Sequence, residues 1–350
     1  MIREFFLNFY NEIRIQVRIS TPRWIGPLHY RNLYALFKER IDKSRLESPF
    51  DLIIQIGFPF EKSVYRVVSG NSGYIEKEYC RIHYQKKTIK SEVEILDIEK
   101  PTILVNIKVN SWGKILFPMD LFNALIHFVA FQKGICLIHA GSISKRGKGV
   151  LLFGAENSGK TFFIIKALAR NYELVDDDFT FIHGKIICNY SPFLVLKFHH
   201  RNIVPFLTWS DRMNLFVKEA ISLLTFGYVK LLTAIHSDKF VKKRRKPKVD
   251  LVKILHLIKG NSMKIGEIKE KKRLVQSMVL ETKIAYPFLV KLSEAYSNLN
   301  PDSTVSMHWS RLGEKLTQYL EDVICEEVQV PTRLTEEEIE KVFGGWEHAV

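Results

Sequence analysis

Residues 150–178, VLLFGAENSGKTFFIIKALARNYELVDDD, decide the fold of this chain. Four apolar residues, 150–153, lead into the segment 154–161, which fits the phosphate-binding pattern G-x-x-x-x-G-K-[ST]. Apolar residues at helical spacing follow, together with alanines that favour a helix. The pattern therefore predicts a buried strand that ends at Gly154, a loop that turns back on itself, and a helix that starts at Lys160.

The residue types of this loop suit the binding of phosphate. Backbone N–H groups of such a loop, and of the helix that follows it, point at the phosphates. The ammonium group of Lys160 neutralises the β and γ phosphate oxygens, and the Thr161 hydroxyl can hold Mg²⁺. The predicted nucleotide-binding residues are Gly154, Ala155, Glu156, Asn157, Ser158, Gly159, Lys160 and Thr161. The alternative is a glycine-rich turn that binds no ligand.

Three carboxylates follow the next predicted strand. Residues 172–175 are a short, mainly apolar segment, and Asp176, Asp177 and Asp178 come directly after it. Acidic groups at the carboxyl end of a strand beside a phosphate loop are placed for a metal contact and a catalytic base. A solvated acidic turn is the alternative interpretation.

The run from His139 through the loop to the aspartates resembles HPr kinase/phosphorylase and its HPr-kinase-like relatives. The signature of that family is a histidine ahead of the glycine-rich loop, G-x-x-x-x-G-K-[ST], and an aspartate pair after the next strand. The resemblance covers roughly residues 117–330 in the order of elements and is specific from 138 to 178. It implies an α/β fold with a P-loop core of the HPr-kinase/PEP-carboxykinase type.

The resemblance also implies a role for each matching residue. Lys160 would contact the phosphates and Thr161 the magnesium ion, while His139 would lie beside the phosphates. Asp177 would be the general base for the acceptor hydroxyl, and Asp178 would lie near the metal. The E-[IL]-R-G-x-G signature of the HPr-specific enzymes does not occur in this sequence. That departure argues against HPr as the acceptor and favours the branch of peptide-tailoring kinases of the lasso-peptide type.

Composition limits the class of protein. The chain has 350 residues and a formal charge of +14, which favours an acidic or phosphorylated partner, a nucleic acid or an anionic membrane. The four cysteines, Cys80, Cys136, Cys188 and Cys325, lack disulfide or zinc spacing. The N-terminus has no continuous apolar segment of the signal-peptide type, and no run of 18 uncharged apolar residues occurs. These features predict a cytoplasmic protein with reduced thiols.

The remaining patterns predict a β-rich N-terminal part ahead of the core. Its antiparallel strands are expected at 52–56, 64–68, 79–84 and 103–108. Helices are expected at 119–132, 215–235 and 274–299, and Pro287 should interrupt the last of them. Strands are expected at 135–138, 193–197, 249–258 and 325–330, and a β-hairpin at 179–187. The strand 325–330 is expected at the edge of its sheet. The predicted domains are 1–116, 117–332 with a basic insertion at about 211–250, and a helical tail, 333–350.

A basic tract follows the predicted helix 215–235. Residues 239–248 contain seven lysines and arginines, a composition typical of a solvated loop. The alternatives are a cradle for an acidic peptide substrate, a membrane-surface contact and a nucleic-acid contact. The upstream residues Lys197, His199, His200 and Arg201 would present positive charge to the acceptor or the γ-phosphate, or form a basic strand edge.

The C-terminal segment 334–345, LTEEEIEKVFGG, predicts a helix. Thr335-x-x-Glu338 fits a capping box, and Gly344-Gly345 fits a glycine stop. The segment also resembles the end of double-glycine leader peptides, which suggests peptide-modifying machinery.

The predicted function is an ATP-dependent kinase that uses Mg²⁺ and transfers the γ-phosphoryl group to serine or threonine of a peptide or protein. The catalytic residues would be Asp177, His139 and Lys160, and the metal ligands Thr161 and Asp178. Two alternatives are a nucleotide-dependent switch protein without catalysis and a kinase for a free hydroxyl compound such as serine. Relatives in the resembling family form rings, so a homo-oligomer is one expectation.

Overall fold

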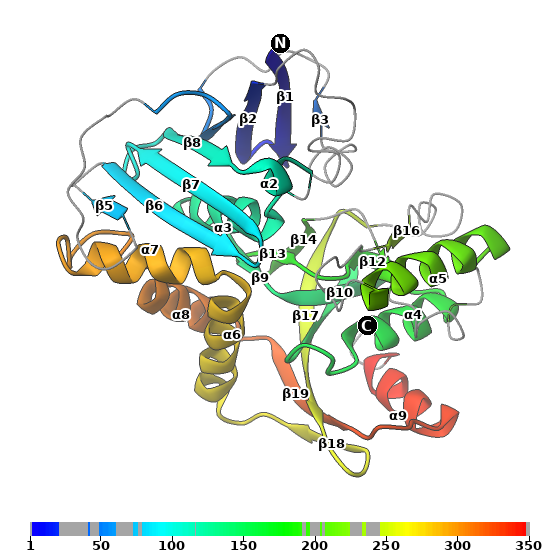
Figure 1. Ribbon diagram of the computed structural model, residues 1–350. Coiled ribbons are helices and arrows are strands. Elements are labelled where there is room, and N and C mark those ends of the chain that lie inside the picture. The colour runs from blue at the N-terminus through cyan, green and yellow to red at the C-terminus, as the bar shows by residue number, and fades with distance from the viewer. Residues whose placement is uncertain are drawn as a thin grey trace. The chain divides into compact units, whose positions relative to one another are not determined.

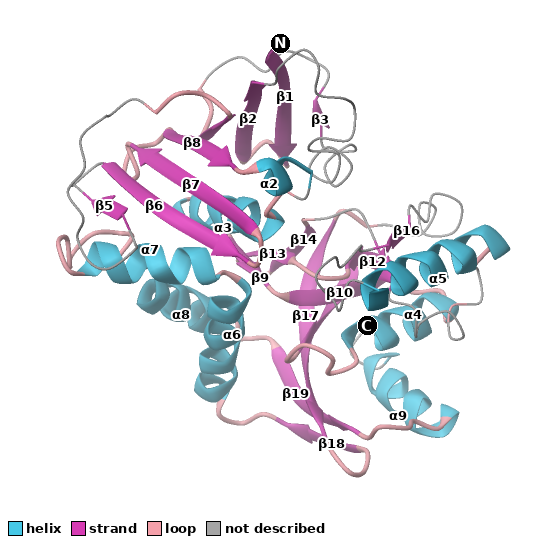
Figure 2. Cartoon of the chain, viewed as in Figure 1, coloured by secondary structure: helices cyan, strands magenta, loops and turns pink. Residues whose placement is uncertain are grey.

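A computed structural model describes residues 2–20, 41–42, 49–60, 73–75, 79–115, 117–190, 194–196, 204, 207–224, 233–235 and 246–347. The chain is mixed α/β and forms two compact units (Figures 1 and 2). The first unit comprises Met1–Gly134 and Lys283–Leu312, and the second comprises Ile135–Thr282 and Gly313–Val350. The two compact units therefore place residues 117–134 and 283–312 with the N-terminal residues. This division differs from the predicted domains 1–116, 117–332 and 333–350.

The first unit contains a mixed sheet. Among the described residues it has eight strands in the order β3-β1-β2-β4-β8-β7-β6-β5. They are β1 (Ile2–Phe9), β2 (Ile13–Ser20), β3 (Ile41–Asp42), β4 (Leu52–Ile56), β5 (Gly73–Ile75), β6 (Tyr79–Lys86), β7 (Ile89–Leu96) and β8 (Ile103–Val109). The prediction of a wholly antiparallel part is wrong, because β2 and β4, and β4 and β8, pair in parallel. After β4 the chain resumes at the far edge and returns strand by strand to β8, which therefore runs in the direction of β4.

Two helices pack on this sheet. The buried helix α3 (Met119–Gln132) confirms the predicted helix, and α7 (Pro287–Ser297) contacts it. Side chains of both helices meet those of β4, β7 and β8 around Phe128 and Phe288. Helix α6 (Lys271–Ala285) ends just before Pro287, which confirms the predicted break because proline cannot continue a helix ladder. The unit also contains α2 (Ser111–Ile115) and the first turn of α8 (His308–Tyr319).

A buried histidine pair lies in the first unit. The Nε2 atoms of His127 on α3 and His308 at the start of α8 are 2.9 Å apart, and both rings are fully buried. Aromatic rings surround them, including Phe131 and Trp309 against His308. Burial, followed by the proximity of His127, holds the pKa of His308 well below its ordinary value.

We expect this pair to make stability depend on pH. The unfolded chain takes up a proton on His308 below about pH 6.5, whereas the folded chain does not, so the unfolding free energy falls as the pH drops below that value. Urea unfolding at pH 7.5, 6.5 and 5.5 measures the dependence. His308→Phe should flatten it, and the control His83→Gln at an exposed position should not. Equal pH dependence in wild type and His308→Phe would contradict this account.

The second unit contains a second mixed sheet around the long strand β17. Its described strands are β9 (Cys136–Ile138), β10 (Ala140–Lys145), β11 (Lys148–Phe153), β12 (Glu173–Asp176), β13 (Thr180–His183), β14 (Ile186–Asn189), β17 (Lys248–Lys259), β18 (Lys264–Glu267) and β19 (Ile324–Val330). Strand β11 lies between β10, which is antiparallel to it, and β17, which is parallel. Strand β19 runs parallel to β17 on the far side from β11, and β18 pairs with β19.

Two predicted elements of this unit are corrected. Strand β19 is not an edge strand, because β18 pairs with it along its outer side. The predicted helix 215–235 is wrong at its end: α5 spans Trp209–Leu224, and β16 (Thr233–Ile235) is a strand paired with β15 (Leu194–Leu196). Three predictions lie outside the described residues: the strand 64–68, residues 239–245 of the basic tract, and the basic residues Lys197, His199, His200 and Arg201.

Helices α4 (Lys160–Ala169) and α9 (Glu336–Glu347) share one hydrophobic core with the central strands. The core includes Phe163 and Ile164 from α4, Leu257 from β17, and Val342 and Phe343 from α9. The four cysteines are free and buried, as expected for structural thiols. None of the helices formed by the described residues has the length and apolar character needed to cross a membrane.

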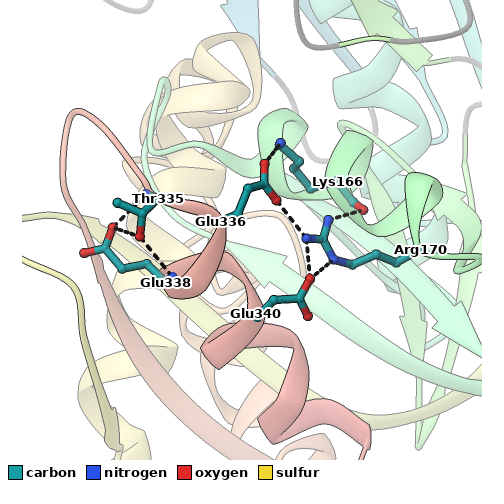
Figure 3. Close-up of polar contacts among 6 residues, drawn as sticks. All are labelled: Lys166, Arg170, Thr335, Glu336, Glu338 and Glu340. Atoms are coloured by element: carbon teal, nitrogen blue, oxygen red, sulfur yellow. Dashed lines mark hydrogen bonds and ion pairs between the residues drawn. The ribbon is translucent and has the colours of Figure 1, made fainter.

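The C-terminal helix α9 is held to α4 by ion pairs as well as by its apolar side (Figure 3). Glu336 pairs with Lys166 and Arg170, and Glu340 accepts a hydrogen bond from Arg170 Nε at 2.8 Å. The predicted capping box is confirmed: Thr335 N donates to Glu338 Oε2 at 2.8 Å, and Glu338 N donates to Thr335 Oγ1 at 3.2 Å.

The predicted glycine stop is wrong, because α9 continues through Gly344 and Gly345 to Glu347. A glycine stop needs a left-handed residue at the helix end, and Gly344 lacks the positive φ that marks one. Val342 and Phe343, directly before the glycines, are buried in the core and hold this turn of the helix in place.

We expect the apolar side of α9 to contribute more to stability than its ion pairs. Phe343 is 3% exposed, so Phe343→Ala should lower the unfolding free energy by about 3–5 kcal/mol. Arg170→Ala should cost only about 1 kcal/mol, since its ion pairs lie at the surface. Urea unfolding of the two variants, with Lys341→Ala as an exposed control, measures the difference. A larger loss in Arg170→Ala than in Phe343→Ala would contradict this ranking.

Candidate active site

The glycine-rich loop, residues 154–159, joins the end of β11 to the start of α4. Gly159 has φ +104°, a left-handed conformation that favours glycine, and its carbonyl accepts the first helical bond, from Phe163 N at 3.0 Å. A methyl group on Gly154 would lie 2.3 Å from the carbonyl oxygen of Leu257, so only glycine lets the loop approach β17 this closely. Residues 155–157 of the loop are exposed to solvent, whereas Ser158 is buried.

Lys160, the first residue of α4, turns its side chain back over this loop. Its ammonium group donates to the carbonyl oxygens of Gly154 at 2.7 Å and Ala155 at 3.1 Å. The residue is 8% exposed. Burial lowers its pKa from the ordinary value, and the carboxylates that oppose this shift are those of Asp178, Glu281, Asp177 and Glu156. A buried cation therefore lies over the loop and within the field of several carboxylates.

The three consecutive aspartates have different surroundings. Asp176, at the end of β12, is fully buried, and its Oδ1 accepts hydrogen bonds from the backbone N–H groups of Asp177 at 2.8 Å and Asp178 at 3.2 Å. Its Oδ2 accepts one from Tyr190 N at 2.6 Å. These bonds fold the acidic turn, so Asp176 is a structural carboxylate, a role that its position in the sequence does not reveal.

Asp177 and Asp178 lie on the turn that Asp176 holds. Asp177 is 4% exposed, whereas the side chain of Asp178 is half exposed. A methyl group on Gly141 of β10 would lie 3.0 Å from the carbonyl oxygen of Asp177, so this glycine lets the turn lie against β10. Since Ala140 is paired with Phe153, the residue before the glycine-rich loop, the turn and the loop are neighbours at one end of the sheet.

His139 lies at the same end of the sheet. It follows β9, and its Nε2 is 3.0 Å from Oδ1 of Asp178. Its ring packs against Phe179 with a centroid distance of 5.3 Å. The structure thus brings together His139 and Asp178, two residues that are 39 positions apart and were both predicted at the site.

The remaining predicted site residue, Thr161, is half-buried at the second position of α4. Among the residues that the structure describes, no group of three or more His, Cys, Asp or Glu side chains is placed to hold a metal ion. Binding of Mg²⁺ by Thr161 and Asp178 therefore remains a prediction. Both supply oxygen, the ligand atom that Mg²⁺ prefers.

Two residues near the site were not predicted. His256 on β17 is opposite Phe153 in register and stacks on its ring at 5.2 Å. Glu281 on α6 acts electrostatically on both Lys160 and His256. They lie about 100 and about 120 residues beyond the loop in sequence, and no local motif marks them. No protein-family model and no curated protein matches the chain.

Proposed function

We propose that the chain is an ATP-dependent phosphotransferase with a P-loop core of the HPr-kinase type. The observation that carries the proposal is the buried Lys160 ammonium, held over the glycine-rich loop within the field of Asp177 and Asp178. A buried cation beside exposed backbone at a helix N-terminus suits the β and γ phosphates of a nucleotide. On binding, the lysine would exchange its bonds to the Gly154 and Ala155 carbonyls for bonds to phosphate oxygens.

The acceptor is a hydroxyl group, and Asp177 is the general base. Its carboxylate takes the hydroxyl proton, the hydroxyl oxygen bonds to the γ-phosphorus, and the bond from phosphorus to the β–γ bridging oxygen breaks, so that ADP leaves. Lys160 stabilises the charge that develops on the phosphate oxygens. Thr161 and Asp178 would hold Mg²⁺, which neutralises further phosphate charge, and His139 orients Asp178 through their 3.0 Å contact.

The proposed acceptor is serine or threonine of a peptide or protein, in a cytoplasmic setting. The formal charge of +14 supports an acidic or phosphorylated partner. Lys246 and Lys248 are the described lysines of the basic tract; the backbone N–H of Lys246 donates to Leu174 O at 3.1 Å and so fixes this end of the tract beside β12. The C-terminal end of the tract thus lies beside the strand that carries the aspartates, which supports a cradle for the acceptor.

Incubation with γ-labelled ATP, Mg²⁺ and a panel of acidic peptides, free serine and HPr tests the proposal. We expect label in a peptide, and less or none in serine and HPr. Label in serine alone would replace the peptide by a free hydroxyl compound as acceptor. ATP binding without transfer to any member of the panel would contradict the kinase and leave a nucleotide-dependent switch.

A further inference from the structure

A cavity of about 650 Å³ lies within the second unit, between helix α6 and the strands β17, β18 and β19. Its strand side is formed by His256, Glu327, Gln329 and the β18 residues around Gly266, and its helix side by Leu274 and Ser277. We call it the α6 cavity. Its volume falls in the range typical of small-molecule and cofactor sites.

The strand register places this cavity next to the glycine-rich loop. Phe153, the residue before Gly154, is opposite His256, which is opposite Glu327, which in turn is opposite Gly266. Adjacent strands lie about 4.8 Å apart, so the strand side of the cavity begins roughly one strand from the loop and ends roughly three strands away. The strand side of the cavity therefore extends from about 5 to about 15 Å from the loop.

The proposed chemistry lies on the opposite flank of β11. Asp177, Asp178 and His139 come from the ends of β12 and β9 and lie beside β10, whereas the α6 cavity begins at β17. Strand β11 separates β10 from β17 in the sheet. A nucleotide whose terminal phosphate faces Asp177 therefore directs its other end across the loop toward β17.

The residues around the cavity suit a nucleoside. Glu327 and Gln329 can accept hydrogen bonds from ribose hydroxyls, and Ile265 of β18, which is 42% exposed, offers an apolar surface to a base. The carboxylate of Glu281 on α6 interacts electrostatically with Lys160 over the loop and with His256 in the cavity. The cavity and the loop therefore lie within reach of the same negative charge. We infer that the α6 cavity binds the nucleoside end of the nucleotide. This inference rests on the proposed function.

Two variants fill the cavity from opposite sides. A side chain at Gly266 would meet no atom of the described residues within 4 Å, so Gly266→Trp extends into open space without disturbing the packing. Ser277 is partly exposed on α6, and Ser277→Trp fills the cavity from the helix. Leu280→Trp is the matched control, because Leu280 is 57% exposed on the same helix and does not line the cavity.

Calorimetry with two probes, ATP·Mg²⁺ and inorganic tripolyphosphate, separates the cavity from the loop. We expect the Kd for ATP to rise about tenfold or more in both cavity variants, while the Kd for tripolyphosphate stays within about twofold of wild type. The control should bind both probes as wild type does.

Unchanged ATP affinity in both cavity variants would overturn the inference. Equal losses for ATP and tripolyphosphate would overturn it too, since they would show an effect on the loop rather than on a nucleoside. A higher acceptor KM at unchanged ATP affinity would assign the cavity to the acceptor instead. A wild-type chain that binds neither probe would contradict the proposed function itself, and this inference with it.

Discussion

Asp177→Asn should lower the rate of phosphoryl transfer by about 10²–10⁴ and leave the Kd for ATP nearly unchanged. Asparagine keeps the size and hydrogen-bonding capacity of the side chain but cannot take a proton from the acceptor. Because the proposed phosphate contacts come from Lys160 and the glycine-rich loop, binding should survive the change. Single-turnover transfer and calorimetric ATP binding measure the two effects separately.

The neighbouring Asp176 provides the control for this variant. It accepts backbone hydrogen bonds from Asp177, Asp178 and Tyr190 with both of its oxygens. Asp176→Asn brings an N–H₂ group against one of these donors, so we expect lower stability in urea unfolding as well as lower activity. Asp177→Asn should unfold like wild type. A large stability loss in Asp177→Asn, or a transfer rate equal to wild type, would contradict the role of Asp177 as base.

Lys160→Met should abolish nucleotide binding, with a loss of at least about 10² in both ATP affinity and turnover. Methionine keeps the length and much of the volume of lysine but carries no charge, so the loop loses the side-chain charge proposed to neutralise the phosphates. The same variant should be at least as stable as wild type without nucleotide, because burial of the ammonium group opposes its charge.

The contrast between function and stability makes this variant informative. Calorimetry gives the ATP affinity, and urea unfolding without ligand gives the stability. A lysine needed only for structure would show the reverse result: a destabilised Lys160→Met variant that still binds ATP. That outcome would contradict the role of the loop in phosphate binding.

Local patterns predicted the elements around the candidate site well. The apolar run before Gly154, the helical spacing after Lys160 and the strand before Asp176 each depend on neighbours within a few residues, and the structure forms β11, α4 and β12 there. The break at Pro287 is equally local, because it follows from the missing N–H of proline.

Roles that depend on tertiary pairing were not predictable in this way. Asp176 and Asp177 are adjacent and chemically identical in sequence, and the backbone hydrogen bonds that Asp176 accepts from its own turn and from Tyr190 N mark it as the structural carboxylate. The internal position of β19 depends on β18, a four-residue strand about 60 residues away. Strand β2, by contrast, was not predicted, although apolar and polar residues alternate along its sequence from Ile13 to Ser20 and the structure buries the apolar ones.

The central claim is that this chain moves the γ-phosphoryl group of ATP to a hydroxyl group. ³¹P NMR of the full chain with ATP, Mg²⁺ and the best peptide acceptor tests it most directly, because ATP, ADP, inorganic phosphate and a phosphate monoester give separate signals. We predict that ADP and the monoester grow in equal amounts with wild type and that ATP persists with Asp177→Asn. Unchanged ATP with wild type, or inorganic phosphate without a monoester, would contradict the claim.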